Sequence, residues 1–211
     1  MNQSMKPGFL RWGLAVVLAA VLAGSMAYAA PDTRGQVATG LTALHAGEYR
    51  KAIPLLSQGI DANALPDNQV YLLYAARGYA QAAEGDYKAA VEDYTACLAK
   101  NPSYLTALYN RGNAYFAMRR YDQAIADYTK LLEADAQNAK VLNNRGAAWF
   151  CKGNLESALA NYNQAIALAP EDTDPLLNRG KVYEAMGEID KARSDFLHIK
   201  ELDPSAKTPL D

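Results

Sequence analysis

The sequence predicts an all-α fold in which helical hairpins stack into a solenoid. One observation is a repeat, because the dipeptide Arg-Gly recurs every 34 residues, at Arg77-Gly78, Arg111-Gly112, Arg145-Gly146 and Arg179-Gly180. A second is that frames of this length, starting at residues 33, 71, 105, 139 and 173, place Gly at position 8 and Ala at position 20 every time. A fixed period of this kind is typical of chains whose units bury their apolar faces only by stacking on one another.

Residues 1–29 have the features of a secretory signal peptide. Two basic residues, Lys6 and Arg11, precede an apolar run at 12–23, and the triplet Ala-Tyr-Ala that ends at Ala29 supplies a small-residue cleavage site. We therefore expect an exported protein, periplasmic or secreted, that begins after Ala29. The alternative is an uncleaved anchor, since the apolar stretch approaches the roughly 20 residues that span a bilayer.

The frames define five repeats and a short tail. They cover residues 33–66, 71–104, 105–138, 139–172 and 173–206, and the tail is 207–211. Within the third repeat, Leu108, Gly112 and Tyr115 are spaced i, i+4, i+7. The same spacing recurs at Ala124, Tyr128 and Leu131, so each repeat is expected to hold two helices.

These residues, together with Arg111 and Tyr121, resemble the framework of the tetratricopeptide repeat family over about five sixths of the chain. The resemblance implies a right-handed superhelical solenoid of antiparallel helix pairs whose first helices line a concave, partner-binding face. Between the helices of a pair the sequence predicts a turn. In the second repeat Gly85 would end the first helix and Asp86 would cap the next one.

The two ends of the predicted stack differ from its middle. The first repeat matches the framework least well, and Pro54 falls inside its second helix, so we expect a looser cap with a kinked helix. In the last repeat Arg193 and Lys200 replace the aliphatic residues found at positions 21 and 28 of every other repeat. This face is therefore expected to meet water and to end the solenoid.

Composition excludes several classes of function. Without Lys6 and Arg11 the chain has 19 basic and 23 acidic residues, which does not favour binding to nucleic acid or to an anionic membrane. The only histidines, His45 and His198, lie in the first and last repeats, and metal-binding, phosphate-binding or nucleophile motifs are missing. We expect no catalytic activity, cofactor or metal. Cys97 and Cys151 are expected to be mostly buried thiols, because a whole repeat separates them.

Position 7 carries an arginine in four repeats: Arg77, Arg111, Arg145 and Arg179. Position 23, on the second helix, carries Asp93, Asp127, Asn161 and Asp195. Since cation and acid recur with the same period, we favour a ladder of ion pairs that ties the helices together. The alternative is a row of arginines that bind anions.

Asparagines recur at position 6, at Asn110, Asn144 and Asn178. By family resemblance these face the groove, where an amide can both donate to and accept from a peptide backbone. The alternative is local hydrogen bonding. The same resemblance assigns to the groove Tyr79, Tyr109, Asn113, Phe116, Lys140, Phe150 and Lys181. Four of these are aromatic and lie outside the packing positions, so we expect Tyr79, Tyr109, Phe116 and Phe150 to be exposed anchors.

The sequence thus predicts a protein-binding adaptor that acts in the cell envelope, as a monomer or as a subunit of a larger complex, through its concave groove. One alternative is a scaffold subunit that uses its convex face or its first repeat. Another is a carbohydrate-binding module that uses the four groove aromatics.

Overall fold

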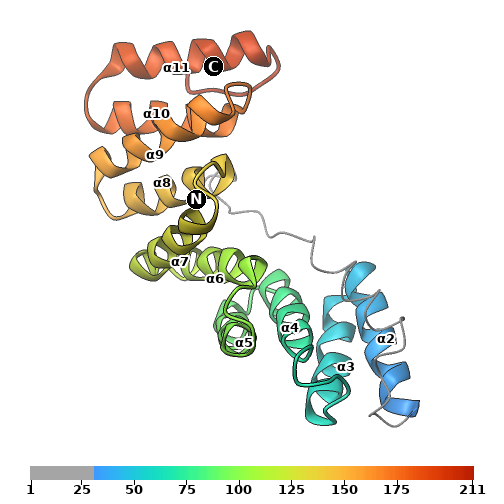
Figure 1. Ribbon diagram of the computed structural model, residues 1–211. Coiled ribbons are helices and arrows are strands. Elements are labelled where there is room, and N and C mark those ends of the chain that lie inside the picture. The colour runs from blue at the N-terminus through green and yellow to red at the C-terminus, as the bar shows by residue number, and fades with distance from the viewer. Residues whose placement is uncertain (1–30) are drawn as a thin grey trace. The chain divides into compact units, whose positions relative to one another are not determined.

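The computed structural model describes residues 31–211, and the regular structure in that part of the chain is entirely helical (Figure 1). This confirms the predicted all-α class. The chain divides after Arg119 into two compact units, which we call the N-terminal unit (31–119) and the C-terminal unit (120–211). The predicted signal peptide lies outside the described residues.

The N-terminal unit contains five helices: α2 (Pro31–His45), α3 (Tyr49–Asp61), α4 (Tyr71–Ala83), α5 (Tyr87–Lys100) and α6 (Leu105–Ala117). Short turns join α2 to α3 and α4 to α5, so the helices of each pair run antiparallel and pack along their lengths (Figure 1). One continuous core links the first pair to α4, through fully buried side chains that include Leu41, Leu56 and Leu73. The first repeat is therefore packed firmly on the second, contrary to the expected looser cap, and α3 continues through Pro54.

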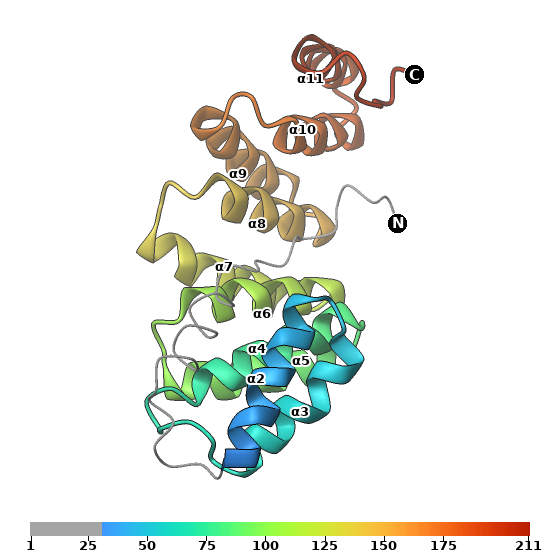
Figure 2. The same cartoon turned by 90° about the vertical axis from the view of Figure 1, so that its right-hand side faces the viewer.

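The C-terminal unit also contains five helices: α7 (Tyr121–Ala134), α8 (Ala139–Cys151), α9 (Leu155–Leu168), α10 (Thr173–Ala185) and α11 (Ile189–Leu202). Here α8 pairs with α9 and α10 with α11, α7 packs on α8, and α9 packs on α10 (Figure 2). The helices thus stack by adjacent pairs, as a tetratricopeptide-like solenoid requires. The residue bounds drawn for the repeats remain predictions.

Glycine at position 8 allows the helices of a pair to approach closely. A Cβ atom at Gly146 would lie 2.8 Å from Cε1 of Tyr162, and one at Gly180 would lie 2.3 Å from Cε1 of Phe196. Both aromatic rings are buried against the backbone of the preceding helix. In these two pairs, the aromatic residue at position 24 leaves no room for a side chain at position 8, which explains the glycine there.

The turns within the pairs follow one design. Asp86 accepts a hydrogen bond from the backbone N–H of Ala89 at 3.1 Å, which confirms the predicted cap of α5. Position 15 adopts a positive φ in all five repeats. It is glycine in four of them, at Gly47, Gly85, Gly153 and Gly187. In the third repeat Arg119 occupies it with φ 61°, a conformation that costs a non-glycine residue about 1 kcal/mol or more.

The tail changes the expected picture of the C-terminal end. Arg193 is exposed, as predicted. Lys200, however, bonds through Nζ to the carboxylate of Asp211 at 2.8 Å, and Thr208 is buried with its backbone N–H donating to the same carboxylate. The tail therefore folds back beside α11 and covers part of the face that we expected to meet water.

Candidate functional site

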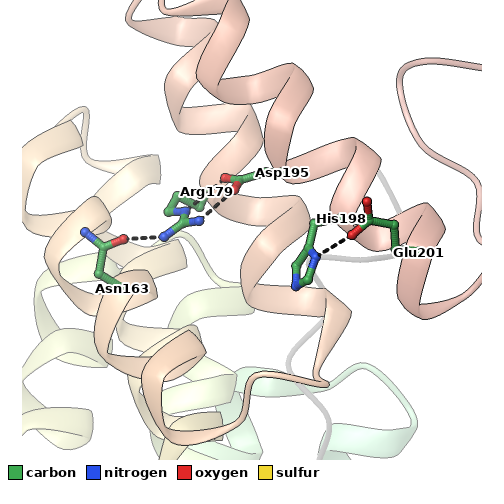
Figure 3. A network of polar contacts seen from close by, with 5 residues as sticks. All are labelled: Asn163, Arg179, Asp195, His198 and Glu201. Carbon is green, nitrogen blue, oxygen red and sulfur yellow. Dashed lines mark hydrogen bonds and ion pairs between the residues drawn. The ribbon is translucent and has the colours of Figure 1, made fainter.

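The arginines at position 7 form a ladder between helices. In the fifth repeat Arg179 donates from Nε and Nη2 to the two carboxylate oxygens of Asp195, at 2.9 and 2.6 Å (Figure 3). Its Nη1 donates to Oδ1 of Asn163 in the preceding repeat, at 2.7 Å. Arg179 on α10 therefore ties α11 to α9, and the bidentate geometry is the strong form of this pair.

The second repeat has the same arrangement. Arg77 donates from Nε and Nη2 to Asp93 at 2.8 and 2.7 Å, and from Nη1 to Oγ of Ser57 at 2.9 Å. The hydrogen bond to the aspartate raises the pKa of Arg77, and the corresponding bond does so for Arg179. The structure confirms the ion-pair interpretation for these two arginines.

The fourth repeat departs from this pattern. Arg145 donates from Nε to Oδ1 of Asn161 at 2.8 Å and from Nη1 to Oγ1 of Thr129 at 3.2 Å, so both acceptors are neutral. The Nδ2 of Asn161 is turned away and donates to the carbonyl of Ser157 at 2.8 Å. Burial consequently lowers the pKa of Arg145, opposite in direction to Arg77 and Arg179.

Sequence reasoning missed the second half of this ladder. The acceptor for Nη1 always comes from position 25 of the preceding repeat: Ser57, Thr95, Thr129 and Asn163. A small polar side chain at one position of four successive repeats was a visible signal for a recurring hydrogen bond. The bond was not predicted because serine, threonine and asparagine are different residues, and the property they share, a side-chain oxygen that accepts a hydrogen bond, is not apparent from residue identity.

The expected groove residues of the N-terminal unit are buried. Tyr79, Tyr109 and Phe116 are 8%, 5% and 7% exposed, and Asn110 and Asn113 are 2% and 0% exposed. The expectation that these aromatics are exposed anchors is therefore wrong. For Tyr79 the reason is that it belongs to the apolar core that α4 shares with α2 and α3. Tyr79, for example, packs edge-on against Tyr49, with ring centroids 6.0 Å apart.

The expected groove residues of the C-terminal unit are more accessible. Lys140 is exposed, whereas Asn144, Phe150 and Lys181 are partly exposed. Asn178 is again buried. These five residues lie on the first helices α8 and α10, which contact each other. We call this surface, including Asn143, the inner face of the C-terminal unit.

An amide pair joins the two helices of the inner face. Nδ2 of Asn178 on α10 donates to Oδ1 of Asn143 on α8 at 3.0 Å. The Oδ1 atom of Asn178 is buried and accepts no hydrogen bond from the described residues. Such a leftover acceptor is uncommon, and an N–H group of a bound chain is one donor that would satisfy it.

Two charged residues lie on the same helix as Asn178. Burial lowers the pKa of Lys181, and it raises the pKa of Asp174. Asp174, Asn178 and Lys181 are spaced i, i+4, i+7 and therefore share one side of α10. The inner face thus combines charges of both signs with amide groups, which suits a polar peptide chain.

His198 and the two cysteines lie on different helices of the described chain. No group of three or more His, Cys, Asp or Glu side chains in this range could hold a metal ion. His198 contacts Glu201, one turn further along α11, at 3.1 Å (Figure 3). Cys97 is buried as expected, but Cys151 is exposed, because it ends α8. No helix in the described part combines the length and hydropathy needed to cross a membrane.

Comparison with protein families agrees with this architecture. The family described as "TPR repeat" matches residues 78–118 and 148–187. Two families described as "Tetratricopeptide repeat" match residues 106–138 and 173–205. No curated protein matches the chain.

Several solved structures share the fold. MamA AMB-1 superposes with a TM-score of 0.70 at 26% identity, covering 85% of this chain and 96% of that one. MamA MSR-1 gives 0.71 at 24% identity, covering 82% and 97%. A MamA fragment from Desulfovibrio magneticus RS-1 gives 0.77 at 20% identity, covering 85% and 99%. The chain is thus similar in fold to these proteins over nearly their whole length.

Proposed function

Because the chain belongs to the tetratricopeptide repeat family, whose helix-pair stacks serve protein–protein interaction, we propose that it is a non-enzymatic adaptor holding a protein or peptide segment on the inner face of its C-terminal unit. The family and the fold support the interaction role. The choice of this face rests on its geometry.

The observation that carries the proposal is the amide pair of Asn143 and Asn178. It holds a buried carbonyl oxygen with no donor from residues 31–211, on the two helices that also carry the partly exposed side chains of Asn144 and Lys181. A peptide backbone offers the N–H groups that such a site lacks, and its carbonyls accept from amide and ammonium groups. Phe150 adds an apolar contact on α8.

The test is capture of a partner from native envelope extract by the full chain, beside a variant with Lys140, Phe150 and Lys181 changed to Ala. A matched control changes Lys130, Leu168 and Lys207, which are two exposed lysines and one exposed apolar residue elsewhere. We expect all three proteins to keep their helicity and melting temperature. A partner lost only with the inner-face variant supports the proposal, and a partner retained by that variant contradicts it.

The proposed location is the periplasm or the cell exterior, supported by the signal-like pattern of residues 1–29. Cell fractionation with N-terminal sequencing tests this. A periplasmic or secreted form that begins at Ala30 is expected. A membrane-bound form that retains Met1 would show an anchor instead.

A scaffold role is the second candidate, and exposed apolar residues at the end of the chain favour it. On α11, Ile189 is 61% and Leu197 is 48% exposed. A neighbouring subunit that docks there would bury both. The carbohydrate-binding alternative loses support, because three of its four aromatics are buried.

A further inference from the structure

Arg145 is the one ladder arginine of the described chain whose position-23 partner is an amide rather than an acid. Its neighbours Arg77 and Arg179 each deliver two hydrogen bonds to a carboxylate, from Nε and Nη2. In Arg145 the Nε and Nη1 groups have neutral acceptors, and Nη2 donates to no atom of residues 31–211. A guanidinium stays charged at any physiological pH, so this repeat retains a positive charge that Asp93 and Asp195 neutralise in the second and fifth repeats.

The aromatic partner of the ladder is also lost here. Arg111 and Arg179 lie over the rings of Tyr115 and Tyr183, which occupy position 11 of their repeats, each at 5.8 Å from the centroid. In the fourth repeat the corresponding ring, Trp149, carries the ammonium of Lys152 instead, at 5.2 Å. Lys152 is in turn paired with Asp122 of α7, so that acid compensates the lysine and not the arginine.

Asn161 stands where the second and fifth repeats have an aspartate. It therefore puts a hydrogen-bond donor where Nη2 of the arginine finds an acceptor in those repeats. Where Asp93 and Asp195 offer Nη2 an oxygen, Asn161 has an NH2 group, which donates to Ser157. Arg145 Nη2 and Asn161 Nδ2 are both donors, and Nδ2 has a second hydrogen to give. An oxyanion from outside the ladder is the acceptor that fits next to both groups.

We propose that Arg145, with Asn161 beside it and Trp149 one helical turn away, is a docking site for a side-chain carboxylate on an acidic segment of another protein. A carboxylate is the group that completes the equivalent positions in the second and fifth repeats. Trp and Arg are the residue types that most often anchor protein interfaces. This site is separate from the inner face and stands independently of the function proposed for that face.

The chain offers a matched pair of variants to test the site. Asn161→Asp supplies the missing carboxylate from within, as in the second and fifth repeats, and should close the site without disturbing the fold. Asp195→Asn makes the converse change at Arg179 and should open an equivalent site there. Arg145→Lys removes the planar guanidinium. The signal that disappears from the nitrogen–proton NMR spectrum is therefore that of Arg145 Nε–H.

The measurement is a titration of the isotope-labelled full chain, followed through the arginine Nε–H signals. The probes are a capped peptide of alternating Glu and Gly, its Lys and Gly analogue, and inorganic phosphate. We expect the Glu peptide to shift the Arg145 signal saturably and the Lys peptide to leave it unchanged. In Asn161→Asp the dissociation constant should rise at least about tenfold, because the internal carboxylate takes the place of the peptide's carboxylate; this corresponds to about 1.4 kcal/mol. In Asp195→Asn the Arg179 signal should begin to respond.

Three results would overturn the proposal. The Arg145 signal could ignore the Glu peptide, or Asn161→Asp could bind the peptide as tightly as the unmodified chain. The third is a signal that responds to phosphate alone, which would assign the site to a phosphate ligand rather than to an acidic protein segment.

Discussion

Single residues set the spacing of the helices in this fold. Gly180 has no room for even one more carbon atom, because the ring of Phe196 lies against it, whereas Gly35 on α2 has no heavy atom within 4 Å of the place where a Cβ would be. The same substitution should therefore have opposite effects at the two positions.

We predict that Gly180→Ala lowers the free energy of unfolding by about 1–3 kcal/mol, the usual cost of overpacking. Gly35→Ala should raise it by up to about 1 kcal/mol, since alanine favours a helix more than glycine does. Urea denaturation of both variants checks this. A Gly180→Ala protein as stable as the unmodified chain would show that the helices can move apart at little cost.

Arg119 is the residue whose backbone is least suited to its side chain. It holds a positive φ at a position that is glycine in the other four repeats. We predict that Arg119→Gly raises the free energy of unfolding by about 1 kcal/mol, because glycine adopts this conformation without steric cost. Gly85→Ala, the reverse change in the second repeat, should be destabilising. Loss of stability in Arg119→Gly would mean that the arginine side chain contributes more than its backbone costs.

The two cysteines should differ in reactivity. Cys97 has no exposed surface, and burial raises the pKa of its thiol to about 12, whereas Cys151 is exposed. Only the thiolate reacts with an alkylating agent. We predict that iodoacetamide at pH 8 modifies Cys151 and leaves Cys97 intact until denaturant is added. Mass spectrometry of the peptides reads this out, and equal labelling of both in the native protein would contradict the burial of Cys97.

At the level of helices, the arginine ladder joins elements that neighbour one another in the stack. The rungs at Arg77 and Arg179 each link a first helix to its own partner and to the second helix of the preceding repeat. The fourth rung makes the same connections through neutral acceptors only. Its contribution to stability should be smaller, because the guanidinium makes single hydrogen bonds to neutral acceptors in place of a bidentate pair with a carboxylate.

We predict that Asp195→Asn lowers the free energy of unfolding by about 2 kcal/mol and that Asn161→Asp raises it by about 1 kcal/mol. Both side chains are nearly buried, so salt should screen the effects only weakly. Thermal and urea unfolding at low and high salt measure them. Two variants with unchanged stability would show that the ladder orders the side chains without stabilising the fold.

The helices and the ladder could be predicted from the sequence because they depend on local periodicity. Gly at position 8, Ala at position 20 and the Arg and Asp positions repeat visibly, and Asp86 sits where a cap belongs. The exposure of Tyr79 and Phe116 could not be predicted this way. For Tyr79 it depends on the core that α4 shares with α2 and α3, which is a property of three-dimensional packing. The packing of the tail beside α11 could not be predicted either, because it depends on a contact between Lys200 and Asp211, which are eleven positions apart.

At the level of the whole molecule, the two units differ in what their first helices offer to a partner. In the N-terminal unit the expected groove residues are buried. In the C-terminal unit Lys140, Asn144, Phe150 and Lys181 keep exposed surface around the amide pair. In our proposal, the N-terminal unit is therefore mainly packed core, and the C-terminal unit binds the partner protein.

Site-specific photo-crosslinking in the native envelope tests that division most directly. A photoreactive amino acid would replace Phe150 or Lys181 on the inner face, and Leu168 or Leu197 as exposed positions elsewhere in the same unit. We predict that one partner protein is crosslinked from 150 and 181 and not from 168 or 197. Crosslinks that form only from 197 would instead place the interaction on α11 and support the scaffold role, and they would contradict binding at the inner face.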